Sequence, residues 1–297
     1  MNRIIHPLLL VMLLLMQVFP VHAADITVVS PQVEHLTKPL GIDVTVPRFS
    51  WKTTATRNDV VQTGYEILVA SSEELLARDR GDLWATGWVP SDAQLWVPYG
   101  GQPLTAHQRA YWKVRVTTNR GRSAWSAPQR FSIGLLGETQ WTGRWIGLEE
   151  LQEGERRGIH PRLAARYLRR EFKAAGQVKR ATAYVAGFGL YEFFINGQKV
   201  GDNQVLMPTP TDYRKTILYN TYDVTSLLAA NNAVGITLAA GRVFPMRQEK
   251  YYKAPVFGLP KCRVNILVEY ADGKRETWST DERWKVTTQG PVRTTNE

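Results

Sequence analysis

The chain has 297 residues, 43% of them hydrophobic, which is enough for about two domains of roughly 100–200 residues each. The formal net charge of +10 favours anionic partners. No recognition-helix or zinc-ligand spacing accompanies that charge, which disfavours nucleic-acid binding. A single cysteine, Cys262, excludes an intramolecular disulfide, so the fold has to rely on its apolar core.

The first residues have the pattern of a secretory signal peptide. Arg3 supplies a positive charge, Leu8–Met16 is an unbroken apolar run, and Val21-His22-Ala23 offers a cleavage site before Ala24. The apolar run is far shorter than the roughly 20 residues that a membrane span needs. Residues 1–23 are therefore predicted to be removed, which makes the mature protein secreted or periplasmic with no membrane association. A retained N-terminal anchor is the alternative.

Residues 24–137 are predicted to form a small β-sandwich. Short strands alternate in Thr63–Ala70 and Trp112–Val116, and Ser71–Arg80 has the capping serine, early acids and terminal arginine of a short helix. The segment Leu104–Ser126 resembles the end of a fibronectin type III domain, in which an aromatic residue precedes a V-x-V strand and a turn. Gln140–Gly147 (QWTGRWIG) is interpreted as the joint to the next domain.

Much of the positive charge falls in Glu153–Arg180, which holds nine Lys/Arg against three Glu. Such a stretch suits nucleic acid or an acidic polysaccharide. The alternative is a solvated, arginine-rich edge of a strand, and we favour that interpretation.

Residues 138–297 are predicted to form a second β-sandwich, of the jelly-roll type found in carbohydrate-binding domains. In Leu190–Ile195, Tyr191, Phe193 and Ile195 share one face of a strand that ends at Asn196-Gly197, a pair suited to a type I′ turn. Most of these aromatic residues are expected in the core. Glu192 lies on the opposite face and needs a partner or water.

An ordered series of motifs resembles the N-terminal part of bacterial α-L-rhamnosidases. Upstream, the series comprises Pro39–Trp51, Thr63–Ser71 and Tyr111–Val116. In the second domain it comprises Tyr191–Asp202 (YEFFINGQKVGD), Thr211–Tyr213 (TDY), Leu218–Val224 (LYNTYDV), Gly241-Arg242, Phe257–Lys261 (FGLPK) and Glu269–Trp284. Each motif is weak by itself, but their order is specific, and the resemblance covers nearly all of the mature chain.

The resemblance implies hydrolysis of terminal α-L-rhamnose from plant glycosides or other rhamnose-containing glycans, with inversion at the anomeric carbon. Such chemistry needs a carboxylic acid and a carboxylate base. In this family both lie on a downstream (α/α)6 barrel. The sequence reaches Thr294–Glu297 without long amphipathic helices, so we expect the barrel to be missing and predict no catalytic residue. The rest of the same polypeptide is then the expected partner.

The resemblance also implies that the second domain assists substrate recognition, with rhamnose and a calcium ion as candidate ligands and no required cofactor. The oxygen ligands Asp202 and Asn203 suit calcium. Carbohydrate-binding candidates are Glu192, Tyr213, Tyr219, Arg242 and Tyr252. The alternative function is a self-standing secreted carbohydrate-binding or adhesion module without catalysis.

Overall fold

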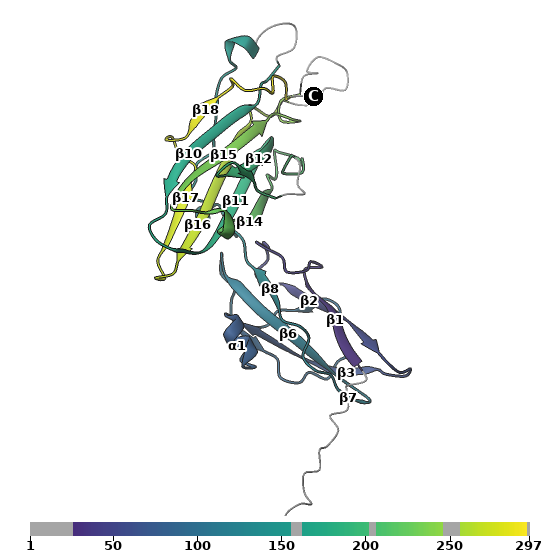
Figure 1. Cartoon of the computed structure of the whole chain (residues 1–297). Coiled ribbons are helices and arrows are strands. Elements are labelled where there is room, and N and C mark those ends of the chain that lie inside the picture. Colours follow the sequence, from purple (N-terminus) through teal and green to yellow (C-terminus); the bar gives the residue numbers. More distant parts are fainter. Residues whose placement is uncertain (1–25, 156–161, 202–205, 246–255, 296–297) are drawn as a thin grey trace, which may run out of the picture. The chain divides into compact units, whose positions relative to one another are not determined.

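The computed structural model describes residues 26–155, 162–201, 206–245 and 256–295, and these are almost entirely strands and connections (Figure 1). Contacts divide the chain into two units. The first consists of Arg48–Pro98, Trp112–Gln129 and the described residues up to Thr37. The second consists of Lys38–Pro47, Tyr99–Tyr111 and the chain from Arg130 onwards. The expected domain ranges, 24–137 and 138–297, place Lys38–Pro47 and Tyr99–Tyr111 in the first domain, whereas the contacts group these segments with the second unit. The domain ranges therefore stay a prediction.

Two antiparallel sheets build the first unit. One has the order β1-β2-β5, and the other has the order β4-β3-β6-β7. β8 also pairs with β6, although its residues from Arg130 onwards are counted in the second unit. The strands are β1 (Ile26–Val33), β2 (Arg48–Ala55), β3 (Gln62–Ala70), β4 (Trp84–Ala85), β5 (Val97–Pro98), β6 (Arg109–Thr118), β7 (Gly121–Arg122) and β8 (Gln129–Ser132). Phe49 on β2 packs edge-on against Trp112 on β6, with ring centroids 4.6 Å apart, and both side chains are fully buried. The predicted alternation therefore buries one face of each sheet.

The outer face of β6 departs from simple alternation. Lys113 alternates with the buried Trp112 and Val114, yet it is itself only 6% exposed. The short helix α1 (Glu73–Ala77), capped by Ser72, covers it, and the Lys113 ammonium donates to the carbonyl of Leu76 at 2.8 Å. The ammonium also pairs with Asp79. A charged residue is buried here because the helix supplies acceptors for its protons.

The second unit is also a pair of sheets. One has the order β13-β12-β15-β10-β18, and the other has the order β14-β11-β16-β17 with β9 also paired to β16. The strands are β9 (Ile146–Gly147), β10 (Arg166–Lys173), β11 (Val178–Phe188), β12 (Leu190–Ile195), β13 (Gln198–Lys199), β14 (Tyr219–Asp223), β15 (Asn231–Ala239), β16 (Lys261–Tyr270), β17 (Arg275–Ser279) and β18 (Lys285–Thr287). Three 3₁₀ turns connect them: η1 (Glu138–Gln140), η2 (Glu153–Glu155) and η3 (Thr225–Leu227).

One core fills the space between these sheets. It takes Leu168 from β10, Phe193 from β12, Ile236 from β15, Val185 from β11 and Ile266 from β16. The hairpin forms as predicted, because Asn196 and Gly197 adopt φ values of 52° and 79°. Tyr191, Phe193 and Ile195 point into the core, and Leu190, Glu192 and Phe194 are half-buried on the other face. A smaller cluster at one end of this sandwich contains Leu163, Tyr213, Ala240, Val243 and Phe244.

Ion pairs neutralise much of the arginine-rich stretch. Arg166 is completely buried and pairs with Glu155 in η2. Arg170 pairs with Asp281 at 2.6 Å, and Arg180 pairs with Glu269. The favoured interpretation, a solvated strand edge, is therefore wrong for these arginines. β10 and β11 are interior strands of their sheets, and Arg166 is buried because Glu155 supplies its counter-charge.

Candidate functional site

Two of the predicted sugar-binding residues, Tyr213 and Tyr219, line the same cleft of the second unit. We call it the aromatic cleft. Its volume is about 260 Å³, and its lining includes Trp141 and Trp145 together with Arg214, Lys215 and Arg263. Aromatic rings and hydrogen-bonding cations are the groups that hold sugars, since rings contact C–H faces and charged groups contact hydroxyls. The cleft is the candidate functional site.

Arg263 on β16 organises one wall of the cleft. Its guanidinium lies 5.1 Å from the centroid of the Trp141 ring, a cation–π distance. It donates to the carbonyl of Gly143 at 2.6 Å and to that of Trp141 at 3.3 Å, and it pairs with Glu138. These contacts fix the segment that carries both tryptophans against the outer face of β16. The wall is thus preformed.

Tyr219 at the start of β14 stands edge-on to Trp141, with ring centroids 5.7 Å apart. Its hydroxyl donates to the carbonyl of Leu135 at 3.0 Å and accepts from the N–H of Leu135 at 2.9 Å. Burial raises the pKa of this phenol. Its polar atom is therefore already used, and only the ring is available to a ligand.

Tyr213 belongs to a loop that precedes β14. Its ring packs edge-on against Phe188 and Phe257, at centroid distances of 5.5 and 5.4 Å, and it is only 9% exposed. Its hydroxyl is buried and has no hydrogen-bond partner among the described residues. Burial raises the pKa of this phenol as well. A buried hydroxyl without a partner is costly, and it is an available donor beside the cleft.

The loop that carries Tyr213 is held by its own polar groups. The backbone N–H groups of Lys215 and Thr216 both donate to the carbonyl of Asp212, at 2.8 and 3.0 Å. The Asp212 carboxylate pairs with Arg214 at 3.0 Å, and this hydrogen bond lowers the pKa of Asp212. Lys215 is exposed and forms no ion pair with the described residues.

The other predicted residues are not brought to this cleft. Glu192 has found its partner in Lys199 across the hairpin, at 2.6 Å, and both lie apart from the cleft lining. Arg242 is exposed in the turn that follows Ala240 and is not among the lining residues. Tyr252, Asp202 and Asn203 lie outside the described residues. The structure thus joins two of the five predicted sugar-binding residues.

Trp141, Trp145, Lys215 and Arg263 are cleft residues that sequence reasoning missed. Both tryptophans lie in the segment interpreted as a joint between domains. Arg263 lies on β16, where no sugar-binding residue was predicted. The available signal was the pair of tryptophans four residues apart in a glycine-containing segment. That signal is weak without knowledge of which strand the segment crosses.

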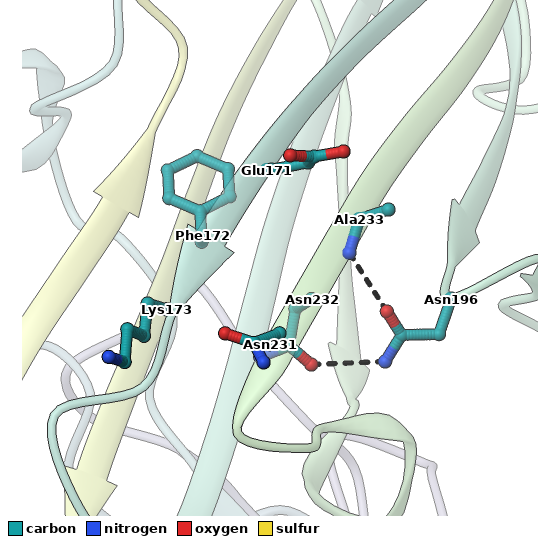
Figure 2. A pocket seen from close by; sticks show the side chains of 7 residues that line it. All are labelled: Glu171, Phe172, Lys173, Asn196, Asn231, Asn232 and Ala233. Atoms are coloured by element: carbon teal, nitrogen blue, oxygen red, sulfur yellow. Dashed lines mark hydrogen bonds between the residues drawn. The ribbon is translucent and has the colours of Figure 1, made fainter.

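A second pocket, of about 520 Å³, lies at the ends of β10, β12 and β15 and is lined by three asparagines, Glu171 and Lys173 (Figure 2). Figure 2 shows the Asn196 amide bonded to Asn232 and to the N–H of Ala233, at 3.0 and 2.8 Å. Asn196 also donates to the carbonyl of Leu227 at 2.9 Å. These amides hold the hairpin in place, so most of the polar lining is occupied by structural hydrogen bonds.

Among the described residues, no group of three His, Cys, Asp or Glu side chains is placed to hold a metal ion. Within the same residues, no helix has the length and apolar character to cross a membrane. The one α-helix there, α1, has five residues, so the described part of the chain contains no helical barrel.

Comparisons with known proteins agree with this architecture. Residues 28–137 match the family model described as Rha78A-like, N-terminal immunoglobulin domain, and residues 176–297 match the α-L-rhamnosidase N-terminal domain. Immunoglobulin and fibronectin type III domains share the sandwich architecture expected for the first segment. Each half of the chain therefore has a counterpart in the same family of proteins.

Several curated proteins and solved structures match this chain over most of its length. An α-L-rhamnosidase of Formosa agariphila is 34% identical over 286 residues, which is 93% of this chain and 30% of that protein. An α-L-rhamnosidase of Alteromonas sp. is 31% identical over 267 residues, or 88% of this chain and 28% of that protein. The solved α-L-rhamnosidase from Dictyoglumus thermophilum has a TM-score of 0.78 and 35% identity, covering 89% of this chain and 30% of its own. The solved α-L-rhamnosidase from Aspergillus terreus has a TM-score of 0.78 and 27% identity, and the match covers 91% of this chain and 30% of that one.

The chain thus spans about 30% of the length of these relatives. It belongs to the α-L-rhamnosidase family and matches the N-terminal portion of such proteins.

Proposed function

We propose that this chain is the substrate-recognition portion of a secreted α-L-rhamnosidase, and that its aromatic cleft binds rhamnose-containing glycans. The observation that carries the proposal is the meeting of Tyr213 and Tyr219 with Trp141 and Arg263 in one cleft. L-Rhamnose is a 6-deoxy sugar, so its methyl group and C–H groups suit aromatic rings. Its hydroxyls suit the guanidinium of Arg263 and the unpaired Tyr213 hydroxyl.

Hydrolysis itself is assigned to the rest of the polypeptide. Inverting glycosidases use a carboxylic acid and a carboxylate base about 6.5–9.5 Å apart. Glu192 and Asp212, two carboxylates of the second unit, are each engaged by a neighbouring cation, Lys199 and Arg214 respectively. The proposed role of this chain is therefore to hold the glycan, and the proposed partner is the downstream catalytic domain.

Isothermal titration of the purified chain with L-rhamnose, a rhamnose-terminated disaccharide and D-glucose tests the proposal. We expect rhamnose and the disaccharide to bind more tightly than glucose. Tyr213→Phe removes only the unpaired hydroxyl, and it should weaken rhamnose binding by about fivefold, equivalent to about 1 kcal/mol. Tyr65→Phe in the first unit is the matched control and should leave binding unchanged. Equal binding of glucose and rhamnose, or no binding, would refute the proposal.

Calcium remains a proposed ligand of Asp202 and Asn203, based on the oxygen chemistry of the pair. Titration in the presence of calcium and of a chelator tests it, and the Asp202→Ala variant should abolish any calcium dependence. Unchanged rhamnose affinity in the chelator would remove calcium from the proposal.

Secretion is likewise proposed from residues 1–23. The test is N-terminal sequencing of the protein recovered from a bacterial periplasm or culture medium, which should begin at Ala24. A mature protein that still begins at Met1 would instead support the retained anchor.

A further inference from the structure

Trp145 lies between two hollows. On one side it lines the aromatic cleft, and on the other it lines a second hollow of about 250 Å³, which we call the edge cleft. Ile146, Leu168, Lys261 and Trp284 also line the edge cleft. The Trp145 side chain is 36% exposed, whereas most of the other tryptophans near this sheet are more buried. A partly exposed indole between two hollows is available to a ligand on both sides.

The two clefts follow one another along β16. Lys261 lines the edge cleft and Arg263 lines the aromatic cleft, while Cys262 between them is buried in the core. Residues two apart on a strand share a face and are roughly 6.6–6.8 Å apart. Strand β9 pairs Ile146 with Cys262 and Gly147 with Lys261, which places Trp145 beside this same stretch. The clefts are thus successive positions on one surface, suited to successive units of a chain-like ligand.

The aromatic cleft carries uncompensated positive charge. Arg263 is paired with Glu138, and Arg214 is paired with Asp212. Lys215 also lines this cleft and forms no ion pair with the described residues. A carboxylate in the cleft would therefore meet an available ammonium, in addition to the remaining guanidinium protons.

The edge cleft has a different electrostatic character. Its carboxylate Asp281 is held by Arg170 and Arg283, each at 2.6 Å, and hydrogen bonds from these arginines help to keep the pKa of Asp281 low. Glu282 pairs with Arg144 at 3.4 Å, and Lys261 is 4.0 Å from Glu149. The charges of the edge cleft are thus matched within the protein. An uncharged sugar suits it better than an anionic one.

We propose that these clefts form a two-subsite groove for an acidic oligosaccharide, with a uronic acid in the aromatic cleft and a neighbouring neutral sugar across Trp145 in the edge cleft. The inference rests on the proposed function, because it assumes that the aromatic cleft binds sugar. In an acidic oligosaccharide, the uronic acid occupies the position that a lone rhamnose takes. It adds that the ligand is a segment of at least two sugars and that Lys215 selects a carboxylate. The overall charge of +10 further favours an anionic glycan.

The test uses two acidic probes, trigalacturonic acid and an aldobiouronic acid in which a uronate is linked to a neutral sugar. Each is compared with its carboxyl-reduced form by isothermal titration. We expect at least one acidic probe to bind about fivefold more tightly than its reduced form. Increasing salt should reduce that difference because Lys215 is exposed to solvent. Lys215→Gln should abolish the difference, whereas Lys274→Gln, at an exposed lysine in another turn, should preserve it.

Trp145→Ala tests the groove. It should weaken the acidic and the reduced oligosaccharides alike by about tenfold, equivalent to about 1.4 kcal/mol. Trp88→Ala is the matched control, because Trp88 is an exposed tryptophan of the first unit. Far-UV circular dichroism of each variant verifies folding.

The outcomes separate this inference from the proposed function. If neutral rhamnosides bind but neither acidic probe is favoured over its reduced form, the uronate inference is overturned and the proposed function stands. If Trp145→Ala leaves oligosaccharide affinity unchanged, the two-subsite groove is overturned. If no saccharide of any kind binds, both proposals fall together.

Discussion

The buried ion pair of Glu155 and Arg166 offers the sharpest test of how the second unit is stabilised. The Arg166 side chain is 0% exposed and that of Glu155 is 5% exposed. The Arg166 guanidinium donates to both carboxylate oxygens of Glu155, one bond measuring 2.9 Å, and to the carbonyl of Ala164 at 2.6 Å. Glu155 also accepts from the N–H groups of Gln152 and Ala164, each at 2.9 Å. This carboxylate therefore joins η2 to the start of β10.

Glu155→Gln keeps the size of the side chain but leaves the buried guanidinium without a counter-charge. Removing one partner of a buried ion pair costs about 3–5 kcal/mol. We expect the free energy of unfolding to fall by that amount. With a urea dependence of about 2 kcal/mol/M, the unfolding midpoint should fall by roughly 1.5–2.5 M. Urea denaturation followed by tryptophan fluorescence and circular dichroism measures this.

The loss should depend on pH. Burial opposes ionisation of Glu155, but the hydrogen bonds and charge of Arg166 and the backbone N–H donors outweigh it, so the pKa of Glu155 is lowered. A carboxyl whose pKa is lower in the folded state contributes stability above its unfolded pKa of about 4.3. That contribution is lost as the pH falls through the folded pKa. The difference between wild type and variant should therefore be full at pH 7 and shrink in acid.

The matched control is Glu171→Gln, which breaks the pair of Glu171 with Arg169. Those side chains are 74% and 64% exposed, so the change should cost less than about 1 kcal/mol. Equal midpoints for Glu155→Gln and wild type at pH 7, or equal losses for the two variants, would refute the reasoning.

Three further outcomes follow from side chains of the second unit. Phe193→Ala removes a ring that is 1% exposed and should lower the free energy of unfolding by about 3–5 kcal/mol, as measured by urea denaturation. A loss below about 1 kcal/mol would show that the core is not packed as described. Asn196, at φ 52°, uses its amide to hold the hairpin, so Asn196→Ala should lower the free energy of unfolding by about 1–3 kcal/mol in the same urea experiment. Asn231→Ala, at an exposed position of the same pocket, should lower it by less than about 0.5 kcal/mol. Burial raises the pKa of Cys262 to about 12, so its thiol should resist a disulfide reagent in native protein and react fully in denaturant, and rapid labelling of native protein would contradict its burial.

Strand positions were predictable because they depend on local alternation. The expected strand Trp112–Val116 lies inside β6 (Arg109–Thr118), and the expected strand Thr63–Ala70 lies inside β3 (Gln62–Ala70). The Asn196-Gly197 turn was equally local, since its positive φ values are a property of those two residues. The need of Glu192 for a partner was foreseen, and Lys199 across the hairpin supplies it.

The candidate site was only partly predictable because it joins distant segments. Tyr213 and Tyr219 were chosen as aromatic residues in loops or strand ends, and they do line one cleft. Nothing in the local sequence indicated that Trp141 and Trp145 line the same cleft as Arg263. The hydrogen bond from Arg263 to the carbonyl of Gly143 joins residues that are 120 positions apart in the sequence. The burial of Lys113 was unpredictable for the same reason, because it depends on a helix residue, Leu76, that lies 37 positions earlier in the sequence.

The sequence by itself determined the all-β class, the placement of most strands and turns, and membership of the α-L-rhamnosidase family. These follow from period-two alternation, turn residues and the order of short motifs, all of which are written along the chain. Only the tertiary structure decided which charges are buried in pairs, as with Glu155 and Arg166, and which aromatic residues share a cleft. The physical reason is that burial and pairing depend on which strands become neighbours, and long-range pairing is a property of the folded sheets rather than of any local segment.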